Sequence, residues 1–290
     1  MNDYLLSVIL GIVEGLTEFL PVSSTAHLRI TEALLHLSLD DAYWKMYTIV
    51  IQLGAILALL LLFRHRIIGY LRTFPKGKRG DKTVLTHPVS LTLIAFVCTA
   101  IPVKMKILEK VIGKNLENLA VIAWALVIGG VVMWVIDTWA AKQTSPTHHV
   151  DNMSLGQAIW VGLCQILSAA VPGTSRSMST IAGGQLAGMN RETALEFSFL
   201  ISIPTMIAAT GDSLLKALHP KPEAGENLTP LVMTGHDWVV LAIGFVVSFI
   251  VAYGVVAWFL AWVRNRGFTP FAIYRIIVGA ALLVWLKMHV

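Results

Sequence analysis

Long apolar runs alternate with short polar segments along this chain, and the runs are long enough to predict membrane-crossing helices. A helix needs about 20 mostly apolar residues to span the hydrocarbon core of a bilayer. Six runs meet this requirement, namely residues 43–63, 87–105, 118–139, 194–217, 237–262 and 270–288. The pattern therefore predicts an all-α polytopic membrane protein.

Two further apolar regions, 4–37 and 154–189, are interrupted by a proline and a cluster of small polar residues. The first region breaks at PVSST and the second at PGTSRS, and each then resumes with a shorter helical stretch. A helix that breaks at membrane depth exposes backbone N–H and C=O groups, which is tolerated only inside protein or beside a watery cavity. We therefore expect both regions to be re-entrant helical hairpins, each entering and leaving on the same side.

The two interrupted regions resemble each other at a constant shift of 151 residues. This shift places Pro21 on Pro172 and Ser24 on Ser175, and it carries the span at 118–139 onto the end of the chain. Gln165 then stands where the first region has Glu14. The alignment indicates an internal duplication of the broken segment together with the spans that follow it.

The chain is accordingly predicted to be a single integral membrane domain, 1–290, with internal repeats at about 1–140 and 152–290. Each repeat holds one hairpin and three spans. Because three is odd, the second repeat is expected to lie upside down relative to the first. Inverted-topology repeats usually build their site near the bilayer midplane from broken helices.

Composition and charge agree with a membrane protein and leave no need for a nucleic-acid partner. Hydrophobic residues make up 56% of the chain and charged residues 13%, whereas soluble domains carry about 25% charged residues. Much of the net charge of +5 lies in the loop at 64–82, and basic loops are typically cytoplasmic. This orientation places the first hairpin outside. The four lysines in 104–118 argue against it.

The first break, EGLTEFLPVSSTAH at residues 14–27, carries side chains suited to metal and acid–base chemistry. Glu14 and Glu18 are four residues apart and share a helix face. Two adjacent carboxylates at membrane depth favour a cation or a shared proton, although they could also pair with a lysine or reach the membrane surface. Mg²⁺ is often held by one or two carboxylates plus substrate phosphates. His27 is a candidate acid–base group and Ser24 a candidate nucleophile.

The second break, PGTSRSMST, has the residues of an anion-binding site. It combines a flexible glycine, Gly173, with hydroxyls and one arginine, Arg176. Backbone N–H groups at a helix start attract anions, and arginine binds phosphate oxygens with a planar fork of donors. A helix cap alone would explain the serines but not an arginine within an apolar hairpin. Together the two breaks suggest phosphoryl chemistry on a substrate that lies in the membrane.

The two segments resemble the signature motifs of the undecaprenyl-diphosphate phosphatase family linked to bacitracin resistance. Those motifs are an E-x-x-x-E segment running into P-V-S-S-T-x-H, and P-G-x-S-R-S-x-x-T; the likeness covers essentially the whole chain. Family members usually have glycine where this chain has Ala26. The resemblance implies a bacterial inner-membrane enzyme that removes the terminal phosphate of a C55 prenyl diphosphate for cell-wall synthesis. It also implies a divalent cation, Mg²⁺ or Ca²⁺, and a site open to the periplasm.

Carried over by motif position, the resemblance assigns three sets of residues. The catalytic candidates are Glu18, Ser24, His27 and Arg176, and the metal candidates are Glu14 and Glu18. The phosphate-binding candidates are Ser23, Thr25, Gly173, Thr174, Ser175, Arg176, Ser177 and Thr180.

The sequence leaves several alternatives open. Ser24, His27 or a metal-activated water could attack the phosphorus. A lipid-phosphate transporter would also use an inverted repeat and an arginine. A non-catalytic scaffold explains none of the buried polar residues. Arg275 could support the site or a helix contact, Gln52 and Gln165 have no assigned role, and a homo-oligomer is neither indicated nor excluded.

Overall fold

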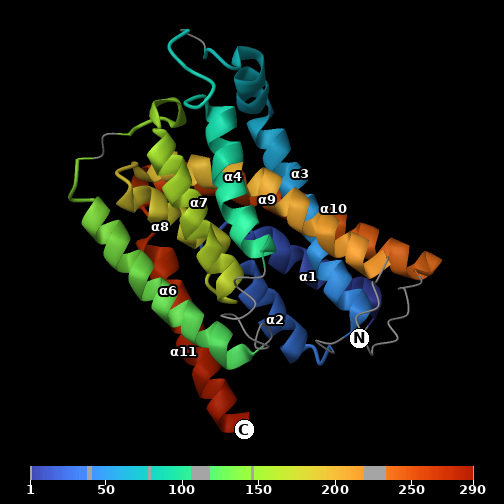
Figure 1. Ribbon diagram of the computed structural model, residues 1–290. Coiled ribbons are helices and arrows are strands. Elements are labelled where there is room, and N and C mark those ends of the chain that lie inside the picture. Colours follow the sequence, from blue (N-terminus) through green and yellow to red (C-terminus); the bar gives the residue numbers. More distant parts are fainter. Residues whose placement is uncertain are drawn as a thin grey trace.

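The computed structural model describes residues 2–37, 41–77, 80–105, 118–144, 147–218 and 233–289, apart from the side chains of 264, 265 and 289. This part of the chain is all-helical (Figure 1), with ten α-helices and one short 3-10 helix. The helices of the first half are α1 (Asp3–Thr17), α2 (Ser24–Leu34), α3 (Ala42–Thr73), α4 (Pro88–Lys104) and α6 (Leu119–Ala140). Those of the second half are α7 (Leu155–Ala170), α8 (Arg176–Leu186), α9 (Arg191–Leu218), α10 (Gly235–Arg266) and α11 (Thr269–His289), preceded by the 3-10 helix Val150–Asn152.

Five helices, α3, α6, α9, α10 and α11, are long and apolar enough to cross a membrane. They correspond to five of the six predicted spans. The sixth, at 87–105, forms α4, which has only 17 residues and contains Pro102. At about 1.5 Å per residue this helix is roughly 25 Å long, shorter than a hydrocarbon core of about 30 Å. The described part of the chain is therefore a multi-pass helical membrane protein.

Both interrupted regions are broken helices, as the sequence predicts. The break between α1 and α2 runs through residues 18–23, and the break between α7 and α8 runs through 171–175. The helices after the breaks, α2 and α8, have 11 residues each. Their N-caps, Ser23 and Ser175, have φ angles of 76° and 74°, a conformation that is uncommon outside glycine. Each cap side chain accepts a hydrogen bond from a backbone N–H in the first turn.

The helix starts correct the alignment of the two breaks by one residue. α2 begins at Ser24 and α8 at Arg176, so the shift between them is 176 minus 24, or 152. The predicted shift of 151 paired Ser24 with Ser175. In the structure Ser23 and Ser175 are the equivalent caps, and Ser24 and Arg176 are the equivalent first residues of the two helices.

The helices of the two halves pack against each other in a reciprocal way. α1 lies along α10, α7 lies along α4, and α6 lies beside α11 (Figure 1). Glycines allow the close approach of these helices, as small residues do in membrane proteins. A Cβ atom at Gly11 would lie 2.8 Å from the carbonyl oxygen of Gly244, and one at Gly162 would clash with the carbonyl oxygen of Ala95. Each helix before a break is thus held against a helix of the other half.

The buried carboxylate of Asp137 links the ends of α6 and α8 to the starts of α9 and α11. Asp137, near the end of α6, accepts hydrogen bonds from Gln185 on α8 and from Arg191 on α9, with the arginine at 2.7 Å. It also accepts from the backbone N–H groups of Phe268 and Thr269 at the start of α11. The carboxylate therefore fixes the position of α11, which carries Arg275 toward the two breaks.

Candidate active site

The two breaks face each other across a cavity of about 430 Å³, within the size range of small-molecule sites. Both breaks contribute to its wall, together with residues from α3, α7 and α9. The lining consists of Glu18, Ser23, Ser24, Thr25, Arg29, Gln52, Ser168, Ala169, Pro172, Gly173, Ser175, Arg176, Thr205, Met206 and Ala209. The tertiary structure thus brings together motifs that lie about 150 residues apart in sequence.

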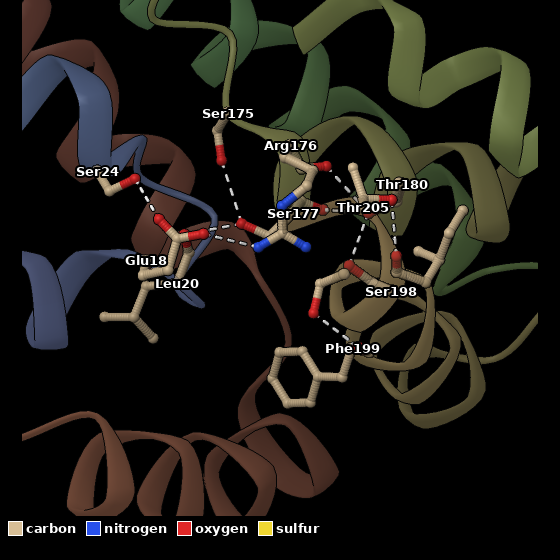
Figure 2. A network of polar contacts seen from close by, with 12 residues as sticks. Glu18, Leu20, Ser24, Ser175, Arg176, Ser177, Thr180, Ser198, Phe199 and Thr205 are labelled. Carbon is tan, nitrogen blue, oxygen red and sulfur yellow. Dashed lines mark hydrogen bonds and ion pairs between the residues drawn. The ribbon is translucent and has the colours of Figure 1, made fainter. Parts of the chain in front are cut away.

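Glu18 connects the two breaks. One carboxylate oxygen, Oε2, accepts a hydrogen bond from Ser24 Oγ at 2.5 Å. The other, Oε1, accepts from a guanidinium nitrogen of Arg176 at 2.8 Å (Figure 2). The Glu18 side chain is buried, so this ion pair is shielded from water and stronger than a surface pair. The carboxylate therefore holds the candidate nucleophile and the candidate phosphate-binding arginine at one place.

The hydroxyls of the second break divide into two groups. Ser175 lines the cavity, together with Gly173 and Arg176. Ser177 instead donates to the carbonyl oxygen of Leu20 in the first break at 2.9 Å, and Thr180 bonds to Ser198 on α9 at 2.6 Å (Figure 2). Neither Ser177 nor Thr180 is part of the cavity wall, and the same holds for Thr174. Ser177 and Thr180 position the second break against its neighbours.

Glu14 lies one helical turn before Glu18 and is fully buried. Within the described part of the chain, neither of its carboxylate oxygens has a hydrogen-bond partner. Its charged neighbours are Glu18 and Arg176. Two buried carboxylates at this spacing fit a hard divalent cation. The described residues contain no group of three His, Cys, Asp or Glu side chains able to hold a metal, so such a cation would take its remaining ligands from substrate or water.

His27 points to the other side of α2. Its Nδ1 atom is bonded to the carbonyl oxygen of Ser23 at 2.7 Å, and its Nε2 atom to the Tyr274 hydroxyl on α11 at 2.8 Å. His27 does not line the cavity, and both of its ring nitrogens are engaged. The sequence places His27 three residues after Ser24 in the motif, but its bond to Tyr274 directs the ring toward α11 and outside the cavity wall.

Arg275 is the residue of the site whose role the sequence left undecided. It is fully buried on α11, and its guanidinium donates to the carbonyl oxygens of both breaks. The acceptors are Pro21 at 3.2 Å, Gly173 at 3.2 Å and Thr174 at 3.0 Å, with Ala125 of α6 at 3.1 Å. Arg275 therefore supports the site and a helix contact together. The sequence marks Arg275 as unusual, because it is an arginine within an apolar span.

The two intramembrane amides take different positions. Gln52, on α3, is part of the cavity wall. Gln165 is buried on α7 and donates to the hydroxyls of Thr99 and Thr205, at 3.2 and 3.0 Å. Gln165 therefore ties the helix before the second break to α4 and α9. Thr205 itself lines the cavity, so this contact reaches the site.

The fold and the cavity together define a class, that of multi-pass helical membrane proteins whose buried polar site lies between two broken helices. A family model described as bacitracin resistance protein BacA matches residues 7–281, and the chain belongs to this family. This finding confirms the family suggested by the two motifs.

Similar proteins from several bacteria share nearly the whole length of the chain. A protein of Koribacter versatilis, named undecaprenyl-diphosphatase, is 63% identical over 98% of this chain and 99% of its own. Proteins with the same name are 42% identical in Rhizobium etli, covering 97% of this chain and 96% of theirs, and 39% identical in Sulfurovum, covering 97% and 99%.

Replacing Arg275 by methionine should destabilise the protein strongly. The four carbonyl groups that Arg275 now binds would lose their donor in an apolar interior, at a cost of about 3 kcal/mol or more, which corresponds to roughly 6 °C or more in Tm. Arg275→Lys should give an intermediate loss, because an ammonium supplies fewer donors and no planar fork. Thermal unfolding in detergent measures this, with Lys287→Met, an exposed position on the same helix, as the control. Equal unfolding temperatures for wild type and Arg275→Met would contradict the assigned role.

Proposed function

We propose that this chain is an undecaprenyl-diphosphatase of the bacterial inner membrane. It hydrolyses the C55 prenyl diphosphate to the monophosphate and inorganic phosphate, and so recycles the carrier lipid for cell-wall synthesis and contributes to bacitracin resistance. The observation that carries this proposal is the carboxylate of Glu18, which holds Ser24 and Arg176 together in one cavity. The shared name of the relatives, which covers nearly the whole chain, supports hydrolysis of this substrate over transport.

Phosphate recognition falls to the second break. Arg176 supplies charged donors, and the backbone N–H groups at the start of α8 add the positive end of a helix dipole. Arg176 lines the same cavity as Glu18 and Ser24, and so does Ser175, the residue that caps α8. A divalent cation held by Glu14 and Glu18 would offset the negative charge of the transferring phosphoryl group. Substrate binding would then place the phosphate oxygens beside Arg176 and Glu18, which both line the cavity.

The hydrogen bond from Ser24 Oγ to Glu18 supports a nucleophilic mechanism with Glu18 as the base. Ser24 Oγ attacks the terminal phosphorus and gives its proton to Glu18, while the bond to the bridging oxygen breaks and the prenyl monophosphate leaves. Water then hydrolyses the serine phosphate and releases inorganic phosphate. His27 holds the start of α2 through its bonds to Ser23 and Tyr274. This arrangement favours Glu18 over His27 as the group that activates Ser24.

A rival function is the transport of lipid phosphates through the same repeat interface. The site fits transport less well than hydrolysis. Glu18 binds Ser24 as well as Arg176, and a transporter has no need for a serine that is hydrogen-bonded to a carboxylate. The names of the relatives also favour hydrolysis.

Purified protein in detergent should release inorganic phosphate from a prenyl diphosphate in the presence of Mg²⁺, and a chelator should stop the release. Glu18→Gln and Arg176→Ala should each lower kcat/KM by about 100-fold or more, because each removes one charge of the buried Glu18–Arg176 pair. Both variants should elute as the wild type does in gel filtration. Full turnover by both variants would contradict the site assignment, and binding without phosphate release by the wild type would favour transport.

The nucleophile can be identified by trapping. Brief incubation with a terminally labelled prenyl diphosphate, followed by denaturation in neutral detergent, which preserves both phosphoserine and phosphohistidine, should leave label on Ser24, and Ser24→Ala should abolish both label and turnover. His27→Gln should keep the label on Ser24, because His27 is bonded away from the cavity. Label on His27 instead would reverse the assignment. Turnover without any trapped label in a rapid-quench experiment would indicate direct attack by water.

We further infer that the two broken helices are re-entrant hairpins within two inverted repeats, at about 1–140 and 152–290. The reciprocal packing supports this, since α1 lies along α10 of the other half and α7 lies along α4. The equal lengths and matching caps of α2 and α8 add a second argument. With the basic loop 64–82 in the cytoplasm, the first hairpin and the cavity would open to the periplasm.

Cysteine labelling of single positions tests this topology in cells. In a background with Cys98 and Cys164 replaced by serine, Asn2→Cys and Asp41→Cys should both react with a membrane-impermeant maleimide in intact spheroplasts. Asp81→Cys, in the basic loop, should react only after permeabilisation. Labelling of Asn2→Cys and Asp41→Cys from opposite sides would mean that α1 and α2 cross the membrane.

A further inference from the structure

Arg29 brings a second guanidinium into the wall of the cavity that holds Glu18, Ser24 and Arg176. Its side chain is 17% exposed and forms an ion pair at 3.2 Å with Glu32, which is 3% exposed. Neither signature motif includes Arg29, and the reaction described above does not use it.

The position of Arg29 along α2 sets it apart from the reacting groups. It follows Ser24 by five residues, which is about 7.5 Å along a helix axis. The helix continues to Leu34, and the chain soon enters α3, which begins at Ala42 and is long enough to cross the membrane. Arg29 therefore lies about one and a half helical turns beyond Ser24, toward the end of α2 that is followed by α3.

The charged groups of the wall match a ligand with two phosphates. Among the described lining residues these groups are Glu18, Arg29 and Arg176. Arg176 is paired with Glu18, beside Ser24, where the terminal phosphate would react. One guanidinium fork binds one phosphate, so a second guanidinium in the same cavity suits the second phosphate of a diphosphate. Arg29 supplies that guanidinium.

We propose that Arg29 binds the phosphate that stays on the prenyl chain, while Arg176 binds the terminal phosphate that is removed. With the terminal phosphate held at Ser24 and Arg176, the second phosphate of the same ligand meets the remaining guanidinium of the described cavity wall, which is Arg29. The buried carboxylate of Glu32 orients the Arg29 side chain. This role rests on the proposed function and names a substrate contact beyond the motif residues.

Binding of a non-hydrolysable prenyl methylenediphosphonate tests this contact separately from catalysis. Arg29→Met should raise its Kd by about tenfold or more, the effect of losing a charged phosphate contact. Because this change removes the guanidinium that contacts Glu32, the double variant Arg29→Met/Glu32→Met should be measured as well, and it should show the same rise in Kd. Arg64→Met is the matched control, since Arg64 is exposed, bonds to the Leu61 carbonyl and does not line the cavity; its Kd should stay within about twofold of wild type.

Turnover of the cleavable diphosphate separates binding from chemistry. KM should rise with Kd in both Arg29 variants, while kcat stays nearly unchanged, because Arg29 does not touch the reacting phosphorus. A wild-type Kd in the double variant, or a fall in kcat at constant KM, would overturn the proposal. If wild-type protein binds the analogue but releases no phosphate from the cleavable lipid, the proposed hydrolysis fails, and the Kd values still decide the role of Arg29.

Discussion

Backbone groups freed by two helix breaks must find partners in an apolar interior, and this constraint governs the rest of the structure. The buried guanidinium of Arg275 donates hydrogen bonds to carbonyl oxygens of both breaks, those of Pro21 in the first and of Gly173 and Thr174 in the second. The cap side chains of Ser23 and Ser175 accept hydrogen bonds from backbone N–H groups at the starts of α2 and α8. One side chain from the last helix thus fixes both breaks relative to each other, and the cavity between them depends on that.

The same pair of breaks carries different chemistry on equivalent positions. Ser24 and Arg176 are each the first residue of an 11-residue helix that follows a left-handed serine cap. One position supplies a hydroxyl and the other a guanidinium, and Glu18 binds both. Two similar local backbones therefore place a hydroxyl and a guanidinium on the same carboxylate, and the proposed mechanism assigns attack to the first and phosphate binding to the second.

Sequence reasoning was strongest for local features. It located both breaks, because a proline followed by small polar residues cannot continue an apolar helix. It also predicted five of the spans that the structure contains. It overestimated α4, whose helix is no longer than 17 residues, and its shift of 151 paired Ser24 with Ser175, whereas the two caps, Ser23 and Ser175, are 152 residues apart. The direction of His27 was also hidden, since it depends on where α11 places Tyr274.

The sequence by itself determined the class of fold, the family and the segments that carry the polar chemistry, because apolar run length and motif spacing are local properties of the chain. Only the tertiary structure decided which side chains meet. It joined Glu18 to Arg176, brought Arg29 into the cavity wall and sent His27, Ser177 and Thr180 to positions outside that wall. The physical reason is that helix packing sets these contacts, and packing depends on close approaches such as that of Gly162 to Ala95, between residues far apart along the chain.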